Sequence, residues 1–276
     1  MLRPFVLAIA LLWLGSPFAQ AATYCVGGPG GGVTHGSIQA ALNTAAANPG
    51  IDTIMVIRRD GIQAQGILIE NQDVILSGAH VNCDPNEALF DPTVLDGSGG
   101  AQTSALIVRN TASASLMHVE ISGFNIIGGD AIGGSGGGLR VDGHVELALS
   151  NLKISQSQAS RGSGIAFFGS DDARLQLGDR VEISSNSASA TGGGLAIFGG
   201  TVLVDGVETS IHGNTALGDG GGIFLSGAGS ANLARLVLRR GRMADTSIGS
   251  LHDVVAGNIS QQGDGGGIAA GAWCDV

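Results

Sequence analysis

The sequence is poor in charged and aromatic residues. Of its 276 residues only 13% are charged and 4% aromatic, with a single tyrosine and a single lysine, Lys153. Thirteen basic residues against 23 acidic ones give a net charge of -10. A chain of this sign repels polyanions, so we expect no nucleic-acid partner.

Long apolar runs and metal-binding spacings are also missing. The longest apolar run, Phe5 to Leu14, falls short of the roughly 20 residues that cross a bilayer as a helix. The three cysteines, Cys25, Cys83 and Cys274, lack the close paired spacing of a zinc site, and the six histidines show no metal-ligand spacing. We expect no transmembrane segment in the mature chain, no metal and no cofactor.

The amino-terminal residues have the pattern of a secretory signal peptide over residues 1–21. Arg3 supplies the positive end, Phe5 to Leu14 the apolar run, and Ala19-Gln20-Ala21 the small-residue cleavage site. The mature chain then begins near Ala22, and loss of Arg3 leaves a net charge of -11. This predicts a secreted or cell-surface protein.

Export to an oxidising compartment favours disulfides. We expect a bond between Cys25 and Cys83, with Cys274 left over.

Glycine and aliphatic residues are abundant. The 48 glycines lack the three-residue period of collagen, and a hydrophobic fraction of 43%, rich in Val, Ile and Leu, requires a core.

About 255 mature residues suit one large domain over 22–276. A cap is expected over about 22–50, with a short helix that Ser37 begins and Pro49 stops. Strand-like runs follow: Asp52 to Ile57, Gly66 to Glu70, Asp73 to Leu76, Thr93 to Leu95 and Ala105 to Val108.

An internal repeat decides the fold class, and it is most regular over 121–276. One element is an aliphatic residue followed three positions later by a small polar residue: Ile127/Asp130, Ile154/Ser157, Ile183/Asn186, Ile211/Asn214 and Val255/Asn258. The other is a glycine cluster closed by an aliphatic residue: Gly138-Leu139, Gly164-Ile165, Gly194-Leu195, Gly222-Ile223 and Gly267-Ile268. Successive polar residues are 27, 29, 28 and 44 positions apart, and the last interval is long enough to hide a degenerate unit around Leu233 to Leu238.

A repeat of this length is a solenoid period. Each unit holds two or three short strands, and stacked units give parallel sheets with strands roughly 4.8 Å apart. We therefore predict an all-β, right-handed parallel β-helix with a short amino-terminal capping helix. Asn186, Asn214 and Asn258 should form a ladder at one corner, and glycine suits the tight reversal at the other.

The pattern Ile-x-x-Asn followed by Gly-Gly-Gly-Ile or Gly-Gly-Gly-Leu resembles the repeats of bacterial polymorphic outer membrane proteins and related autotransporter passengers. The segment Thr93-Val94-Leu95-Asp96-Gly97, with the Ile38 helix, resembles the capped amino end of pectin-lyase-like β-helices. The chain reaches Val276 without a recognisable carboxyl cap. Either another chain covers that end or the sequence is a fragment.

Asp171-Asp172 is the only adjacent carboxylate pair, and paired acids hydrolyse glycosidic bonds. In a β-helix the pair resembles that of polygalacturonases, but those enzymes need a further Asp one coil earlier, and Asn151 to Ile154 contains none. A solvated loop is therefore favoured. Lys153 and Arg174 are the candidates for the base of a lyase, but nothing in the sequence places them together. Surface roles are favoured for both.

A further column lies four residues before each closing aliphatic: Ser135, Arg161, Thr191, Asp219 and Asp264. Two acids in one column could share a cation. With a degenerate unit between them, however, Asp219 and Asp264 would lie about two rungs, or roughly 10 Å, apart. Solvated turn acids are favoured.

The resemblance implies an exported bacterial surface protein that acts as an adhesin-like binding or structural module, with a surface glycan or protein as partner. The alternative is a polysaccharide-active hydrolase or lyase of the pectin-lyase-like class. Units of nearly constant length leave little chain for the loops that wall a catalytic groove, so the sequence favours binding over catalysis.

Overall fold

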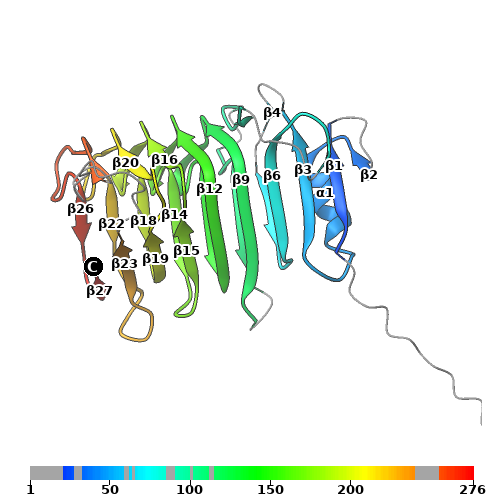
Figure 1. The fold of residues 1–276 in the computed structure, drawn as a ribbon. Helices are drawn as coiled ribbons and strands as arrows, with labels where there is room; N and C mark the ends of the chain where they lie inside the picture. The colour runs from blue at the N-terminus through cyan, green and yellow to red at the C-terminus, as the bar shows by residue number, and fades with distance from the viewer. Residues whose placement is uncertain are drawn as a thin grey trace, which may run out of the picture.

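The protein is a parallel β-helix, seen here in a computed structural model (Figure 1). The structure describes residues 21–27, 33–58, 62–63, 66–84, 91–99, 102–111, 115–239 and 255–276. The signal peptide expected over residues 1–21 therefore lies outside the described residues except for Ala21. Every pairing between named strands is parallel, and each strand pairs with its counterpart in the next coil.

From β9 (Met117–Ile127) onward each coil passes through four faces, which we number in chain order. Face 1 and face 2 share β9 (Met117–Ile127) and β12 (Val145–Ser155), whose halves lie on either side of a bend. Face 1 also contains β1 (Thr23–Val26), β2 (Val33–His35), β3 (Asp52–Ile57), β6 (Val74–His80), β15 (Arg174–Leu177), β19 (Gly200–Val204), β23 (Ala234–Leu238) and β27 (Cys274–Asp275). Face 2 also contains β4 (Ile62–Gln63), β7 (Thr93–Asp96), β16 (Val181–Ser184), β20 (Ser210–His212) and β24 (Val255–Ala256).

The other two faces form separate sheets. Face 3 contains β10 (Asp130–Ser135), β13 (Gln158–Arg161), β17 (Ser187–Thr191), β21 (Thr215–Ala216) and β25 (Ile259–Ser260). Face 4 contains β5 (Ile67–Glu70), β8 (Leu106–Asn110), β11 (Leu139–Gly143), β14 (Ile165–Gly169), β18 (Leu195–Ile197), β22 (Ile223–Leu225) and β26 (Ile268–Ala270).

Aliphatic residues stacked from coil to coil fill the interior. On face 1, for example, Leu147, Leu175, Val202 and Leu236 are register partners, and all are buried. Side chains alternate across each strand, so their neighbours in sequence point outward. The outer positions, which the core does not constrain, are where a functional surface can be built.

The predicted capping helix is confirmed as α1 (Ile38–Ala45). The Ser37 hydroxyl accepts a hydrogen bond from the Ala40 backbone N–H at 3.2 Å, as an N-cap does. Its buried face packs against β1, β3 and β5 and covers one end of the core (Figure 1). Within the described part of the chain, no helix has the length and hydrophobicity that crossing a bilayer requires.

The asparagine ladder predicted between faces 2 and 3 is present. The Nδ2 of Asn214 donates to Asn258 Oδ1 at 3.0 Å, and the Nδ2 of Asn186 donates to Asn214 Oδ1 at 3.0 Å. Each Oδ1 also accepts the backbone N–H of the residue one coil earlier, ending at Ser157. The ladder holds successive corners in one register.

Glycine forms the corner between faces 3 and 4. Gly162, Gly192, Gly220 and Gly265 all have φ between +56° and +67°, a region that disfavours side chains. A Cβ at Gly192 would lie 2.6 Å from the Leu195 carbonyl oxygen. The chain can therefore reverse this tightly only because glycine stands there.

The degenerate unit expected around Leu233 to Leu238 does not exist, and that prediction is wrong. β20 pairs directly with β24, β21 with β25 and β22 with β26, so the 44-residue interval is a single coil. β23 supplies face 1 of this coil. The additional length lies in two longer connections: eight residues, 226–233, join β22 to β23 where two join β18 to β19, and 16 residues join β23 to β24 where five join β19 to β20. Residues 240–254 of the second connection lie outside the described residues.

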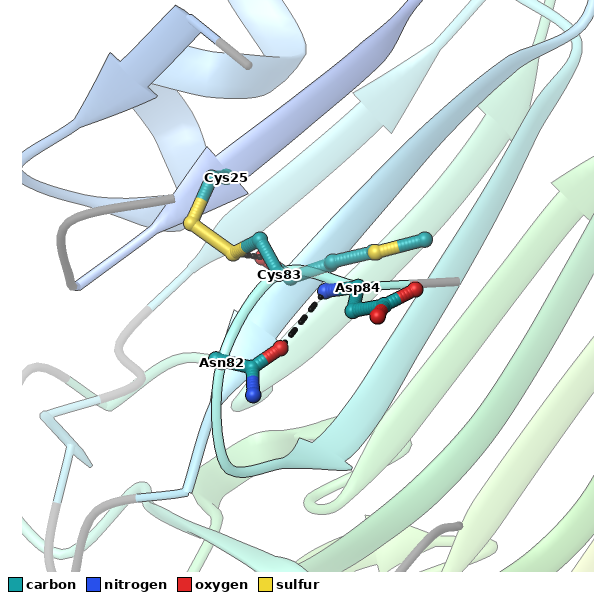
Figure 2. Close-up of a disulfide and its surroundings, with 5 residues drawn as sticks. Cys25, Asn82, Cys83 and Asp84 are labelled. Atoms are coloured by element: carbon teal, nitrogen blue, oxygen red, sulfur yellow. Dashed lines mark hydrogen bonds between the residues drawn. A yellow bond between two sulfur atoms is a disulfide. The ribbon is translucent and has the colours of Figure 1, made fainter. Parts of the chain in front are cut away.

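The Cys25–Cys83 disulfide expected from the sequence is present and joins β1 to the segment after β6 (Figure 2). Beside it, the Asp84 backbone N–H donates to Asn82 Oδ1 at 2.9 Å. The bond ties the first coils together next to the cap. Cys274 is not disulfide-bonded and lies on β27, in the last coil.

Candidate functional site

The Asp171-Asp172 pair lies in the exposed turn between β14 and β15, with the two carboxylates beside different basic side chains. Asp172 Oδ1 lies 2.9 Å from His144 Nδ1, one coil earlier, and Asp171 Oδ1 lies 3.8 Å from Arg235 Nη1, two coils later. The carboxylates are thus drawn in opposite directions along the helix axis. Both carboxylates therefore have partners within the protein, which favours a role in anchoring the turn over one in glycoside hydrolysis.

The protonation of Asp172 points the same way. Burial raises its pKa, but hydrogen bonds from Ser170 and His144 and the charge of His144 outweigh this effect and hold the pKa below its ordinary value. A general acid needs the opposite shift, toward neutral pH. Asp172 is therefore a poor proton donor and a good anchor for the turn.

Two histidine–carboxylate pairs, which sequence reasoning missed, lie near this turn. Besides His144 and Asp172, His118 Nδ1 lies 2.9 Å from Glu146 Oε2 on face 1. The spacing in the sequence could have predicted both pairs, because the two residues of each pair are 28 positions apart, which is one coil. Side chains one repeat apart on the same face meet across neighbouring strands.

Neither histidine activates a nucleophile. The Ser170 hydroxyl donates to Asp172 Oδ1 at 3.1 Å rather than to the imidazole, whereas a serine–histidine–carboxylate relay needs the imidazole in the middle. The Ser77 Oγ and His80 Nε2 atoms lie 2.8 Å apart on β6, but His80 is buried with 4% of its surface exposed. The arrangement of these side chains therefore does not support acyl transfer by Ser170 or Ser77.

A groove of about 510 Å³ lies on the outside of face 1. It crosses β9, β12, β15, β19 and β23, so its floor is five coils long. One row of outward residues consists of His118, Glu146, Arg174 and Thr201, which are register partners. The next row consists of Glu120, Ala148, Gln176, Leu203 and Val237.

The groove carries charges that the protein itself does not use. Within the described residues, the Arg174 guanidinium and the Glu120 carboxylate have no hydrogen bond or ion pair, and both side chains are exposed. Ala148, Leu203 and Val237 give the floor a partly exposed apolar strip. An apolar floor with charged groups at its rim is suited to holding an extended ligand.

The two residues considered as a lyase base are not brought together. Arg174 lies in the groove on face 1, whereas Lys153 lies on face 2, where its Nζ is 2.8 Å from Glu182 Oε1. The structure therefore supports surface roles for both.

The predicted acidic column is continuous, but the spacing given for its last two members was wrong. Asp219 and Asp264 lie on adjacent coils, and the Asp264 backbone N–H donates to Asp219 Oδ1 at 2.7 Å. Among the residues that the structure describes, no cluster of three or more His, Cys, Asp or Glu side chains could hold a metal ion. The two acids act here as turn residues.

A row of phenylalanines on the outside of face 4 is a second unusual surface. Phe168 and Phe198 are stacked with ring centroids 4.8 Å apart, and Phe224 lies 6.0 Å further on. The guanidinium carbons of Arg140 and Arg161 lie 5.2 Å and 5.5 Å from the centroids of Phe168 and Phe198. The faces of these rings therefore contact one another and the two guanidinium groups, and these contacts between neighbouring coils stabilise the β-helix.

The fold and the groove define a class: a parallel β-helix protein with a ligand-sized groove on one outer face. No protein-family model matches the chain, and comparisons with curated proteins and with solved structures found no match.

Proposed function

We propose that the protein is an exported bacterial surface or extracellular β-helix that binds an extended ligand, a surface glycan or a protein, in the face 1 groove. The observation that carries the proposal is the combination of unused charges, Arg174 and Glu120, with an apolar floor in one groove. An adhesin-like role fits this surface, and so does the resemblance to polymorphic outer membrane protein and autotransporter-passenger repeats.

Three further features support the proposal. The signal-like residues 1–21 provide for export, and a net charge of -10 disfavours polyanionic partners such as nucleic acids. The groove floor belongs to paired strands, so it is already formed before a ligand arrives. A preformed site avoids part of the ordering cost of binding.

The test is a binding screen of the mature protein against glycan and host-protein arrays, followed by titration of the strongest ligand. Arg174→Gln and Glu120→Gln should each weaken that ligand about tenfold, since each removes one charged contact worth about 1.4 kcal/mol. The matched controls are Arg180→Gln and Glu208→Gln. Both control residues are exposed and lie outside the groove.

Unchanged affinity in both groove variants, with the ligand still bound, would place the binding site elsewhere. Equal losses in groove and control variants would indicate a nonspecific charge effect.

The alternative, a hydrolase or lyase acting on acidic polysaccharides, has a separate test. We expect no turnover of polygalacturonate with or without calcium, because the carboxylates of Asp171 and Asp172 are engaged by His144 and Arg235. Turnover that disappears in Asp171→Asn or Asp172→Asn would overturn the binding proposal. Activity equal in the wild type and both variants would point to a contaminant.

A further inference from the structure

Asp52, the first residue of β3, is a buried carboxylate without a cation. Its exposed fraction is 1%, and within the described chain it has no ion-pair partner. Oδ1 accepts two hydrogen bonds of 2.7 Å, from the Ala22 backbone N–H and from Asn48 Nδ2. Oδ2 is buried and accepts none. An ionised carboxylate in this position is costly unless a positive charge compensates it.

One of the two residues that donate a hydrogen bond to this carboxylate is Ala22, where the sequence predicts that the mature chain begins. Ala22 is fixed on both sides, because its carbonyl accepts the Thr53 N–H at 2.9 Å while its own N–H points at Asp52. β1 starts at the next residue and pairs with β3 from Thr23 onward. The nitrogen of Ala22 is therefore held beside the carboxylate by the sheet.

We propose that proteolytic maturation at the Ala21–Ala22 bond creates the missing cation, and that the new α-ammonium group of Ala22 forms a buried ion pair with Asp52. An export peptidase adds water across the peptide bond, so that the C–N bond breaks and Ala21 leaves with a carboxylate. The Ala22 nitrogen takes up a proton and becomes an ammonium. The inference rests on the export that belongs to the proposed function, but not on any ligand.

The chemistry of the new terminus matches what the site lacks. A peptide nitrogen offers Asp52 one N–H and no charge, whereas an ammonium offers three N–H groups and a full positive charge. One N–H keeps the bond to Oδ1, and a second is available to Oδ2, the atom without a partner. Hydrogen bonds between ionised groups are about twice as strong as neutral ones.

Tyr24, two residues after Ala22, is a titratable neighbour of Asp52. Burial, followed by the charge of Asp52, raises the pKa of Tyr24, whose ring also contacts His35 at 5.6 Å between centroids. An ammonium ordinarily has a pKa of about 7.7–8.0, and a buried carboxylate raises it. The ion pair is then fully present below that ordinary range and is lost as the pH rises through the raised value.

The proposed ion pair links export to the stability of the first coils. In the precursor the Asp52 carboxylate faces a neutral amide, so the first coils are less stable before the leader is removed. Processing and completion of the fold are thereby coupled at a single bond.

The experiment uses the protein exported from a bacterial host. Intact mass and amino-terminal sequencing should give Ala22 as the first residue. A second precursor, whose leader is cleaved to leave one extra alanine before Ala22, should yield a protein that melts about 5–10 °C lower, because its Ala22 nitrogen is an amide. Asp52→Asn should lower the melting temperature of the first protein by a similar amount and that of the second by much less.

The control is Asp73→Asn. Asp73 also accepts a backbone N–H, from His118 at 2.8 Å, but it does not contact the terminus, so its variant should shift both proteins equally. Should Asp52→Asn prevent folding, the α-amine of the unaltered protein can be titrated by its rate of reductive methylation, and its pKa should lie above 8. A terminus at another residue, equal melting of the two proteins or an ordinary amine pKa would each overturn the proposal. Loss of ligand binding alone would bear only on the proposed function.

Discussion

Replacement of Asn214 by leucine tests whether the asparagine ladder holds the coils together. Asn214 is fully buried, and its side chain takes part in four hydrogen bonds. Its Oδ1 accepts from the backbone N–H and the Nδ2 of Asn186, and its Nδ2 donates to the Ile183 carbonyl and to Asn258 Oδ1. Leucine has the same number and branching of side-chain heavy atoms, but it is larger and has none of these polar groups.

The expected cost follows from the partners left behind. The Asn186 backbone N–H, whose residue is 1% exposed, loses its acceptor, and an unpaired buried group of this kind costs about 1–3 kcal/mol. The Asn186 amide and the Ile183 carbonyl each lose one further bond of about 1 kcal/mol. Burial of the leucine side chain offsets part of this sum, so we expect a loss of about 3 kcal/mol.

Urea unfolding followed by circular dichroism measures this loss directly, and the denaturant slope should stay constant if only stability changes. Asn258→Leu is the matched comparison, because Asn258 occupies the same column in the last coil and is only partly buried. Water can replace some of its lost bonds, so its cost should be smaller. A loss below about 0.5 kcal/mol for Asn214→Leu would refute a structural role for the ladder.

Three other perturbations address the corner, the disulfide and a surface charge. Gly192→Ala should cost about 2–4 kcal/mol in urea unfolding, because φ is +65° and the new Cβ meets backbone, whereas Gly133→Ala, at φ +76° with nothing within 4 Å, should cost only about 1 kcal/mol. Equal losses at the two glycines would remove the steric argument. Cys83→Ser should lower stability by about 2–4 kcal/mol, since the disulfide closes a loop of 58 residues; unfolding that is insensitive to reductant would contradict it. Burial raises the pKa of Glu182, but hydrogen bonds from Lys153 and Ser184 and the charge of Lys153 lower it by more, so this pKa lies below the ordinary value for a glutamate. Glu182→Gln should therefore lower the melting temperature above pH 4.5, with the difference fading as the pH falls through the lowered pKa; a difference that grows on acidification would reverse the sign.

The interior was predictable from the sequence because the core repeats. Ile183 and Ile211 are register partners and both are buried, and the constant offset to Asn186 and Asn214 was enough to place the ladder. Helix α1 was predictable from its cap and apolar face. These features depend on short-range spacing, which sequence displays directly.

The groove was not predictable in the same way, since its residues point outward and repeat no motif. Some contacts between outward side chains could have been predicted, because complementary residues 28 or 29 positions apart, such as Lys153 and Glu182, meet across one coil. The separation assigned to Asp219 and Asp264 failed for a related reason. Distance along the helix axis follows the number of coils, and the chain length between two residues exceeds one period where a coil carries an insertion.

The coil that contains β23 and β24 shows how the architecture treats added sequence. β24 keeps its register with β20, and β26 with β22, although 16 residues (239–254) stand between β23 and β24 where only five (205–209) stand between β19 and β20. Chain length and axial rise are therefore independent variables at this position. A foreign peptide inserted between two faces would lengthen one coil without changing the distance between coils along the axis. Such a connection could therefore carry a displayed peptide.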